Sequence, residues 1–104
     1  LKAEKVLIST ATAVELHIFV FARLGAEGIL RLGHLFAQPL FEMVPVGRRQ
    51  MVIANQAYER FGRGRHPAKL NYGDLFSYAL AKSRDLPLLF KGSDFSETDL
   101  ESCL

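Results

Sequence analysis

The fold is decided by the stretch Leu70-Asn71-Tyr72-Gly73-Asp74 and by the later stretch Pro87-Leu88-Leu89-Phe90-Lys91-Gly92-Ser93-Asp94-Phe95. In the first, Asn71 is a typical N-cap, and Asp74 then falls in the first turn of a helix, where free backbone N–H groups favour a carboxylate. The second is a short apolar run after a proline, as found in parallel sheets, and Asp94 follows its end. Because ligands of open α/β sheets bind at the C-terminal edge of the strands, the two stretches predict two carboxylates at one rim.

Strand and helix patterns alternate along the rest of the chain, with strands at residues 5–9 and 41–46, a strand-to-helix junction at 10–15, and helices at 16–24, 26–36 and 48–61. Gly25 is a typical residue for ending the first helix, and Pro39 lies where the second can no longer continue. The first helix is apolar nearly all round, so burial on more than one side is expected. This alternation predicts the α/β class with a mainly parallel sheet.

The composition is that of a packed globular domain. At 104 residues, the chain is long enough for one core and too short for two domains. Its hydrophobic fraction of 49% and mean hydropathy of +0.11 exclude a disordered chain. The net charge of +2 excludes a global basic field, so a nucleic-acid site would have to be a local patch.

The chain shows no sign of secretion or membrane insertion, so a cytoplasmic location is expected. The single cysteine is Cys103, which excludes an internal disulfide and fits a reducing compartment. No signal peptide is recognisable. The most apolar stretch, residues 11–24, contains Glu15, His17 and Arg23 and is too short to span a bilayer.

Three carboxylates carry the predicted chemistry: Glu15, Asp74 and Asp94. Glu15 is expected in the first turn of a helix that follows a strand, which places it at the same rim as the other two. Carboxylates brought together repel one another, and a shared divalent cation removes that repulsion. Mg²⁺ prefers such oxygen ligands together with water and substrate phosphate. The pattern therefore predicts a metal site for phosphoryl chemistry, in which the ion activates water and stabilises the leaving oxygen.

Each carboxylate also has an ordinary structural explanation. Thr12-x-x-Glu15 matches a capping box, in which the glutamate bonds back to the backbone N–H of the N-cap. Asn71-x-x-Asp74 matches an acidic first turn, and Asp94 matches a turn residue. Spacing alone leaves both the catalytic and the structural interpretation open.

Four motifs occur in order along the chain: Ile8-Ser9-Thr10-Ala11-Thr12-Ala13-Val14-Glu15-Leu16, Tyr58-Glu59-Arg60-Phe61-Gly62-Arg63-Gly64-Arg65-His66-Pro67-Ala68, Leu70-Asn71-Tyr72-Gly73-Asp74 and Leu88-Leu89-Phe90-Lys91-Gly92-Ser93-Asp94-Phe95. Together they resemble the PIN-domain ribonucleases, and most closely the VapC-type toxins of bacterial toxin–antitoxin pairs. The resemblance covers nearly the whole chain, from about residue 6 to residue 100. The basic loop followed by Asn-Tyr-Gly-Asp and Phe-Lys-Gly-x-Asp-Phe makes it specific.

The resemblance implies a PIN-like three-layer α/β/α fold and a metal-dependent endoribonuclease that uses Mg²⁺ or Mn²⁺. It matches Glu15, Asp74 and Asp94 to the family's metal-binding and catalytic carboxylates, whereas Asp99 matches a recurring position without an assigned role. The implied partners are an RNA substrate, a VapB-type antitoxin and a second copy of the chain. The family uses the apolar helices near residues 19–35 for dimerisation and antitoxin binding, and an ordinary core role for them also stays open.

Further residues are expected to support the site. Basic side chains beside Asp74 or near the rim are suited to RNA phosphates, although a solvated loop would have the same composition: Arg63, Arg65, His66, Lys69 and Lys91. Three polar residues are expected to hold the carboxylates in position: Thr12, Asn71 and Ser77.

One feature of the family has no counterpart. PIN domains open with a strand of the form hydrophobic-hydrophobic-Asp-(Ser/Thr)-Ser-Ala, whose aspartate is a leading metal ligand, and Lys2-Ala3-Glu4-Lys5 does not match it. We therefore expect residues 1–104 to be a single PIN-like domain that lacks its N-terminal strand and helix, in agreement with Leu1 as the first residue. Such a chain is expected to be poorly folded and weakly active alone. The alternative is a non-catalytic remnant that acts as a dimerisation or antitoxin-binding module.

Overall fold

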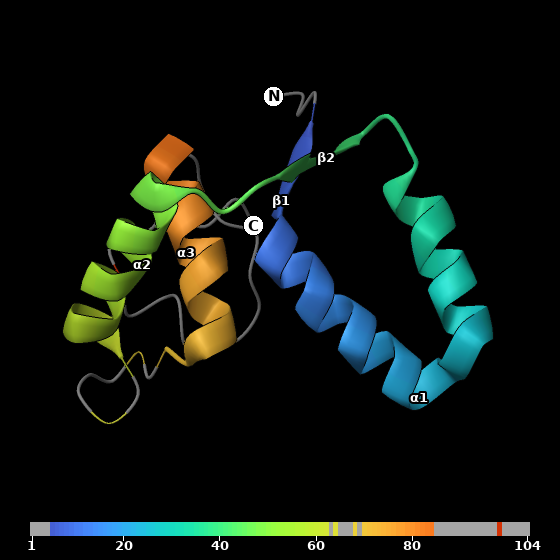
Figure 1. Cartoon of the computed structure of the whole chain (residues 1–104), viewed down its shortest axis with the longest axis horizontal. Helices are drawn as coiled ribbons and strands as arrows, with labels where there is room; N and C mark the ends of the chain where they lie inside the picture. Colours follow the sequence, from blue (N-terminus) through green and yellow to red (C-terminus); the bar gives the residue numbers. More distant parts are fainter. Residues whose placement is uncertain (1–4, 63, 65–67, 69, 85–97, 99–104) are drawn as a thin grey trace. The chain divides into compact units, whose positions relative to one another are not determined.

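The structure is a computed structural model that describes residues 5–62, 64, 68, 70–84 and 98. It divides into two compact units, Leu1–Pro45 and Val46–Leu104, each of which is described by itself (Figure 1). The predicted strand at residues 88–90 lies outside the described residues.

The first unit is a strand–helix–strand segment. Strand β1 (Val6–Ser9) is followed by helix α1 (Thr10–Phe36) and strand β2 (Phe41–Val44). The strands pair in parallel, with Val6 opposite Phe41 and Ser9 opposite Val44. Parallel neighbours need a crossover connection, which α1 supplies. The predicted strands are confirmed, and Pro45 follows the end of β2, where its missing N–H costs no ladder hydrogen bond.

Helix α1 bends sharply at Gly25, as Figure 1 shows. Gly25 has φ 65° and ψ −156°, a combination that is essentially restricted to glycine because it has no Cβ. The predicted helix end at this residue is therefore confirmed as a break between two helical arms, residues 10–24 and 26–36. The bend turns the second arm away from the direction of the first.

Many apolar side chains of α1 are exposed and the others in its first arm are at most half-buried, which makes the predicted burial on more than one side wrong for the chain by itself. Val14, Ile18 and Leu24 are 61%, 64% and 66% exposed, and Phe19 and Phe21 are more than half exposed. The sequence pattern shows that the helix surface is apolar, but it does not identify the surface that packs against the helix. Among the helices of the described residues, none combines the length and the apolarity that crossing a membrane requires.

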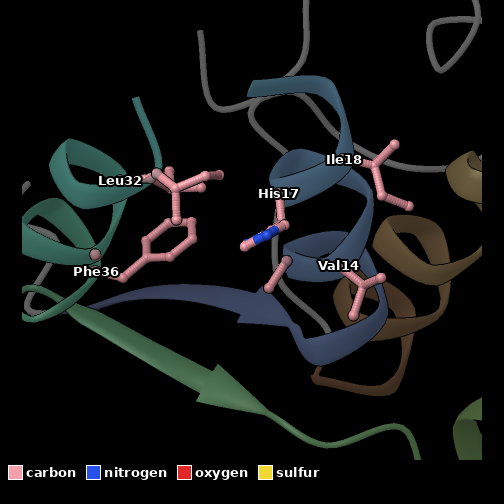
Figure 2. A pocket seen from close by; sticks show the side chains of 8 residues that line it. Val14, His17, Ile18, Leu32 and Phe36 are labelled. Carbon is pink, nitrogen blue, oxygen red and sulfur yellow. The ribbon is translucent and has the colours of Figure 1, made fainter. Parts of the chain in front are cut away.

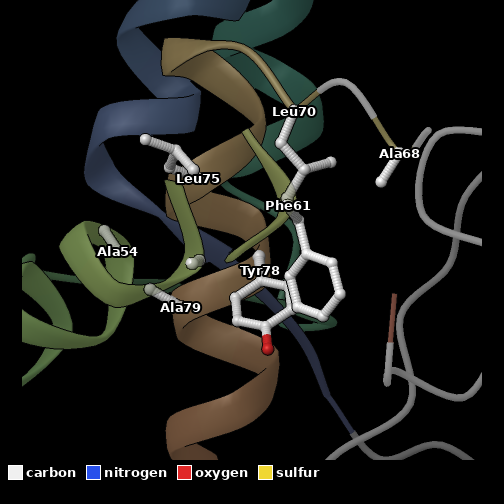
Figure 3. Close-up of a cluster of buried hydrophobic side chains, with 8 residues drawn as sticks. Ala54, Phe61, Ala68, Leu70, Leu75, Tyr78 and Ala79 are labelled. Atoms are coloured by element: carbon white, nitrogen blue, oxygen red, sulfur yellow. The ribbon is translucent and has the colours of Figure 1, made fainter. Parts of the chain in front are cut away.

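The second unit is built from α2 (Arg48–Phe61) and α3 (Tyr72–Arg84), which pack against each other (Figure 3). The bounds of α2 agree with the predicted helix at residues 48–61. The rings of Phe61 and Tyr78 meet at the centre of the interface, with centroids 5.7 Å apart. Ala54, Ala57 and Ala79 fill the space around them as small side chains, so the two helices can approach closely.

A short parallel bridge joins the end of α2 to the start of α3. Gly62 pairs with Leu70, and the Leu70 N–H donates a 3.0 Å hydrogen bond to the Phe61 carbonyl oxygen. Gly62 is buried against Tyr58, where a Cβ would lie 2.6 Å from the tyrosine ring and would overlap the tyrosine carbonyl oxygen. Leu70 is fully buried, so both ends of the intervening loop are held in the core.

We expect Gly25→Ala to destabilise the first unit by about 1–3 kcal/mol, because alanine is strained at this φ and ψ. Gly33→Ala is the matched control. It lies in the same helix, and a Cβ at either glycine would have no other atom within 4 Å. At a helical position alanine is favoured over glycine, so the control is expected to add about 0.5–1 kcal/mol. Urea unfolding followed by circular dichroism measures both, and equal effects would contradict the conformational argument.

Candidate active site

The start of α3 orients the carboxylate of Asp74. Asn71 precedes the first helical residue and accepts a 3.0 Å hydrogen bond at Oδ1 from the Asp74 N–H. In return, Asp74 Oδ2 accepts a 3.0 Å hydrogen bond from the Asn71 N–H. This is the reciprocal geometry of a capping box, with asparagine and aspartate in the two positions. The predicted cap and acidic first turn are both confirmed, and the Asp74 side chain is half-buried in a defined orientation.

The buried residues of α3 that adjoin Asp74 anchor the helix to the core. Leu75, Tyr78 and Ala79 are buried against α2, whereas Ser77 is half-buried three residues after Asp74. Side chains three residues apart on a helix are neighbours, so Ser77 flanks Asp74. The packing fixes the helix axis, and the cap fixes the carboxylate at its end. The predicted orienting role of Ser77 stays a prediction.

Glu15 lies one turn later than the sequence pattern indicates. Helix α1 begins at Thr10 with Ser9 as its N-cap, and Ser9 Oγ accepts a 3.2 Å hydrogen bond from the Ala11 N–H. The first turn contains no acidic residue, so the prediction that Glu15 lies in it is wrong. Thr12 is inside the helix, which also excludes the Thr12-x-x-Glu15 capping box.

The Glu15 carboxylate is exposed, and no side chain or backbone group among the described residues bonds to it. The capping-box explanation of Glu15, which spacing alone had left open, is therefore excluded. An unpartnered exposed glutamate is compatible with a metal ligand and equally with a solvated side chain. The orienting role predicted for Thr12 stays a prediction.

The three predicted ligands are not observed together. Glu15 belongs to the first unit, Asp74 belongs to the second, and Asp94 lies outside the described residues. Within the part of the chain that the structure describes, no three His, Cys, Asp or Glu side chains are close enough to hold a metal ion. The chemistry of the two described carboxylates does fit a hard divalent cation, because both offer oxygen donors at positions that water can reach.

The predicted contacts to RNA phosphate lie outside the described residues: Arg63, Arg65, His66, Lys69 and Lys91. Their loop is nevertheless bounded by described residues. The bridge between Gly62 and Leu70 closes it, and Leu70 directly precedes Asn71. Gly64, the exposed residue inside the loop, has φ 83°, which glycine adopts without strain.

The bend of α1 creates an apolar cavity that the sequence pattern did not predict. It has a volume of about 440 Å³ and is lined by both helical arms. His17 points from the first arm toward Leu32 and Phe36 on the second (Figure 2). The His17 ring also stacks on Phe21, with centroids 6.5 Å apart, and it is exposed rather than packed in a core. The signal that could have revealed the cavity is Gly25, since a break there allows two apolar faces to diverge.

Comparison with known proteins places the chain in a family. The sequence pattern of the PIN domain family matches residues 1–101. The chain belongs to the PIN-domain family. This PIN domain is 45% identical over 94 residues to Ribonuclease VapC30 of Mycobacterium tuberculosis strain H37Rv, covering 90% of the chain and 72% of that protein. It is 45% identical over 93 residues to Ribonuclease VapC of Mycolicibacterium smegmatis, covering 89% and 72%.

A third relative, Ribonuclease VapC28 of Mycobacterium tuberculosis, is 49% identical over 74 residues, with 70% of this chain and 56% of that protein covered. The PIN domain described above is therefore of the VapC type, as its motifs predicted. The predicted α/β class is confirmed by this membership and by the parallel pairing of β1 and β2. That residues 1–104 form one domain without the family's first strand stays a prediction.

We expect Leu70→Ala to destabilise the second unit by about 2–5 kcal/mol, because it leaves a cavity beside the start of α3. Val52→Ala on α2 is the control, since Val52 is 43% exposed and its truncation should change stability by no more than about 0.5 kcal/mol. Urea titration of both variants measures the difference. Similar midpoints for the two would show that Leu70 does not anchor the site.

Proposed function

We propose that the protein is a metal-dependent endoribonuclease, the toxin of a toxin–antitoxin pair, which hydrolyses RNA phosphodiester bonds with Mg²⁺ or Mn²⁺. Family membership supports the class of reaction, since the relatives carry the name ribonuclease. The observation that carries the site is the Asp74 carboxylate, which is half-buried and held in one orientation by Asn71. Cytoplasmic RNA is the proposed substrate.

In this proposal Glu15, Asp74 and Asp94 hold the divalent ion as oxygen ligands. The ion, when bound, lowers the pKa of its water and stabilises charge on the phosphate oxygens. The chain's own contribution is to present the carboxylates. Asp74 is presented by the cap at the start of α3, and Glu15 is presented on the exposed side of α1. The basic side chains Arg63, Arg65, His66 and Lys91 are proposed to bind the flanking RNA phosphates, which carry no sequence information.

The cap hydrogen bond uses one acceptor position of the Asp74 carboxylate. An ionised carboxylate has two oxygens and about four acceptor positions, and the Asn71 N–H occupies one position on Oδ2. Capping and metal binding are therefore compatible in one side chain. An ordinary helix would show the same cap without a metal. A variant that keeps the cap and loses the charge therefore distinguishes Asp74 as a metal ligand from Asp74 as a helix cap alone.

Asp74→Asn is that variant, because its amide oxygen can still accept the Asn71 N–H while the anionic ligand is lost. In protein expressed from its complete reading frame, we expect metal-dependent cleavage of RNA to fall at least about 100-fold. Stability should fall by only about 0.3–1 kcal/mol, from the lost charge at the helix N-terminus. Initial rates over a Mn²⁺ titration and thermal unfolding measure the two quantities.

The control is Glu59→Gln, which makes the equivalent neutralising change at an exposed position of α2. It should leave both quantities unchanged. If the Asp74→Asn variant cleaves RNA as fast as the wild type, Asp74 is only a helix cap and not a metal ligand. A folded wild-type protein that cleaves no RNA with either ion would instead favour the non-catalytic interaction module.

The cavity of α1 supports the antitoxin as the protein partner. Its walls are mostly apolar side chains that are exposed or half-buried, and an apolar segment of the antitoxin that fills the cavity would bury them. The exposed apolar residues elsewhere on α1 are proposed to contribute to a homodimer. Burying such side chains contributes roughly 25 cal/mol per Å² of apolar surface, which is the driving force for both contacts.

We expect His17→Glu to weaken antitoxin binding at least about ten-fold, because the bound segment would bury an unpaired charge. His34→Glu introduces the same side chain at an exposed position of the same helix that does not line the cavity, and it should bind as the wild type does. Calorimetry with the cognate antitoxin measures both affinities. Equal affinities would place the antitoxin elsewhere.

A further inference from the structure

We propose that Tyr72 is a stacking platform for one base of single-stranded RNA, beside the bond that is cleaved. This inference rests on the proposed ribonuclease function and adds a substrate-binding residue to it. The observation behind it is the exposure of one aromatic ring. Tyr72 is the first residue of α3 and is 78% exposed, the highest value among the large hydrophobic side chains of the described residues.

The ring of Tyr72 is held by a second aromatic ring. Phe76, which is half-buried one helical turn later, meets it with centroids 5.0 Å apart and ring planes at 78°. In this edge-to-face arrangement Phe76 covers at most one face of Tyr72. Among the described residues, Tyr72 makes no other ring contact, hydrogen bond or ion pair. One ring face is therefore open to solvent, and the contact with Phe76 lowers the entropic cost of ordering the ring when a ligand binds.

The neighbours of Tyr72 in the chain indicate the size of its ligand. Asn71 is polar and exposed, Gly73 has no side chain and Asp74 is charged, so the ring is not part of a continuous apolar stretch. The core of a protein interface needs a broader apolar patch. A nucleobase needs only one flat ring, and the bases of single-stranded RNA stack readily on aromatic side chains. The ring of Tyr72 therefore fits one base better than it fits a protein surface.

The position of Tyr72 in α3 places this base next to the cleaved bond. Tyr72 and Asp74 both lie in the first turn of the helix, and two residues of a helix are separated by about 3 Å along its axis. Residues two apart do not share a helix face. The ring would therefore take a base that flanks the reacting phosphate, without competing with the role proposed for Asp74. Because every base has a π-face, we expect affinity for unpaired RNA with little selection among bases.

Substitutions at Tyr72 separate stacking from other effects of the ring. Tyr72→Phe keeps the aromatic face, Tyr72→Leu keeps apolar bulk without a π-face, and Tyr72→Ala removes both. Because the side chain is 78% exposed, each variant should keep a nearly unchanged thermal midpoint. Met51→Ala is the matched control, since it truncates another exposed apolar side chain of the same unit.

The test measures RNA binding by fluorescence anisotropy without divalent ions, with protein expressed from the complete reading frame. One probe is a labelled single strand of adenosine and cytidine, which cannot pair with itself, and the other is the same strand without its bases. Tyr72→Ala and Tyr72→Leu should bind the base-bearing strand roughly 5- to 150-fold more weakly than the wild type, and the abasic strand within about two-fold of it. Tyr72→Phe and Met51→Ala should bind both strands as the wild type does.

Equal affinity of the wild type and Tyr72→Ala for the base-bearing strand would overturn the proposal. An equal loss on both strands would also overturn it, because the ring would then act on the RNA backbone. Wild-type affinity in Tyr72→Leu would show that the aromatic face is irrelevant. If Tyr72→Ala binds RNA normally and loses affinity only for the antitoxin, the ring belongs to a protein interface and the proposal is again overturned.

Cleavage of RNA with Mn²⁺ distinguishes failure of this inference from failure of the proposed function. A wild-type protein that cleaves RNA, beside a Tyr72→Ala variant that binds RNA as tightly, contradicts only the role of Tyr72. A folded wild-type protein that neither binds nor cleaves RNA contradicts both.

Discussion

The candidate site depends on the burial of Leu70. Its side chain is fully enclosed in the core of the second unit, and its N–H is bonded to the carbonyl oxygen of Phe61. These two interactions hold the start of α3 against the end of α2. Asn71 and Asp74 come next in the chain, so their reciprocal hydrogen bonds form on a fixed base. Orientation of the carboxylate is in this sense a consequence of core packing.

In the proposed site, structural and functional demands converge on Asp74 because they require the same chemistry. A helix start needs acceptors for its free N–H groups and favours an anionic one, and a divalent ion needs an oriented oxygen donor. One carboxylate can satisfy both, since it has more acceptor positions than the cap uses. Glu15 differs, because Ser9 caps its helix and the glutamate has no bonding partner among the residues that the structure describes. The two carboxylates therefore differ in how they are positioned: Asp74 takes part in the cap of its helix, whereas Glu15 does not.

Local chemistry made several features predictable from the sequence. Asn71 was predicted as a cap because few residue types cap well, and Gly25 as a helix end because few residue types adopt its backbone conformation. The position of Glu15 was misjudged because Ser9, Thr10 and Thr12 are all competent caps, and the helix begins at Thr10, directly after the strand, instead of after the predicted junction at 10–15. Exposure of α1 was not predictable, since apolarity does not identify the covering surface.

The most direct measurement is anomalous diffraction from crystals of the protein, expressed from its complete reading frame and soaked with Mn²⁺. The account predicts a manganese peak within about 2.0–2.3 Å of a carboxylate oxygen of Asp74, with Glu15 among the remaining ligands and the Asn71 hydrogen bonds retained. A catalytically active protein whose manganese lies away from Asp74 would contradict the account, because the oriented carboxylate would then be only the cap of α3.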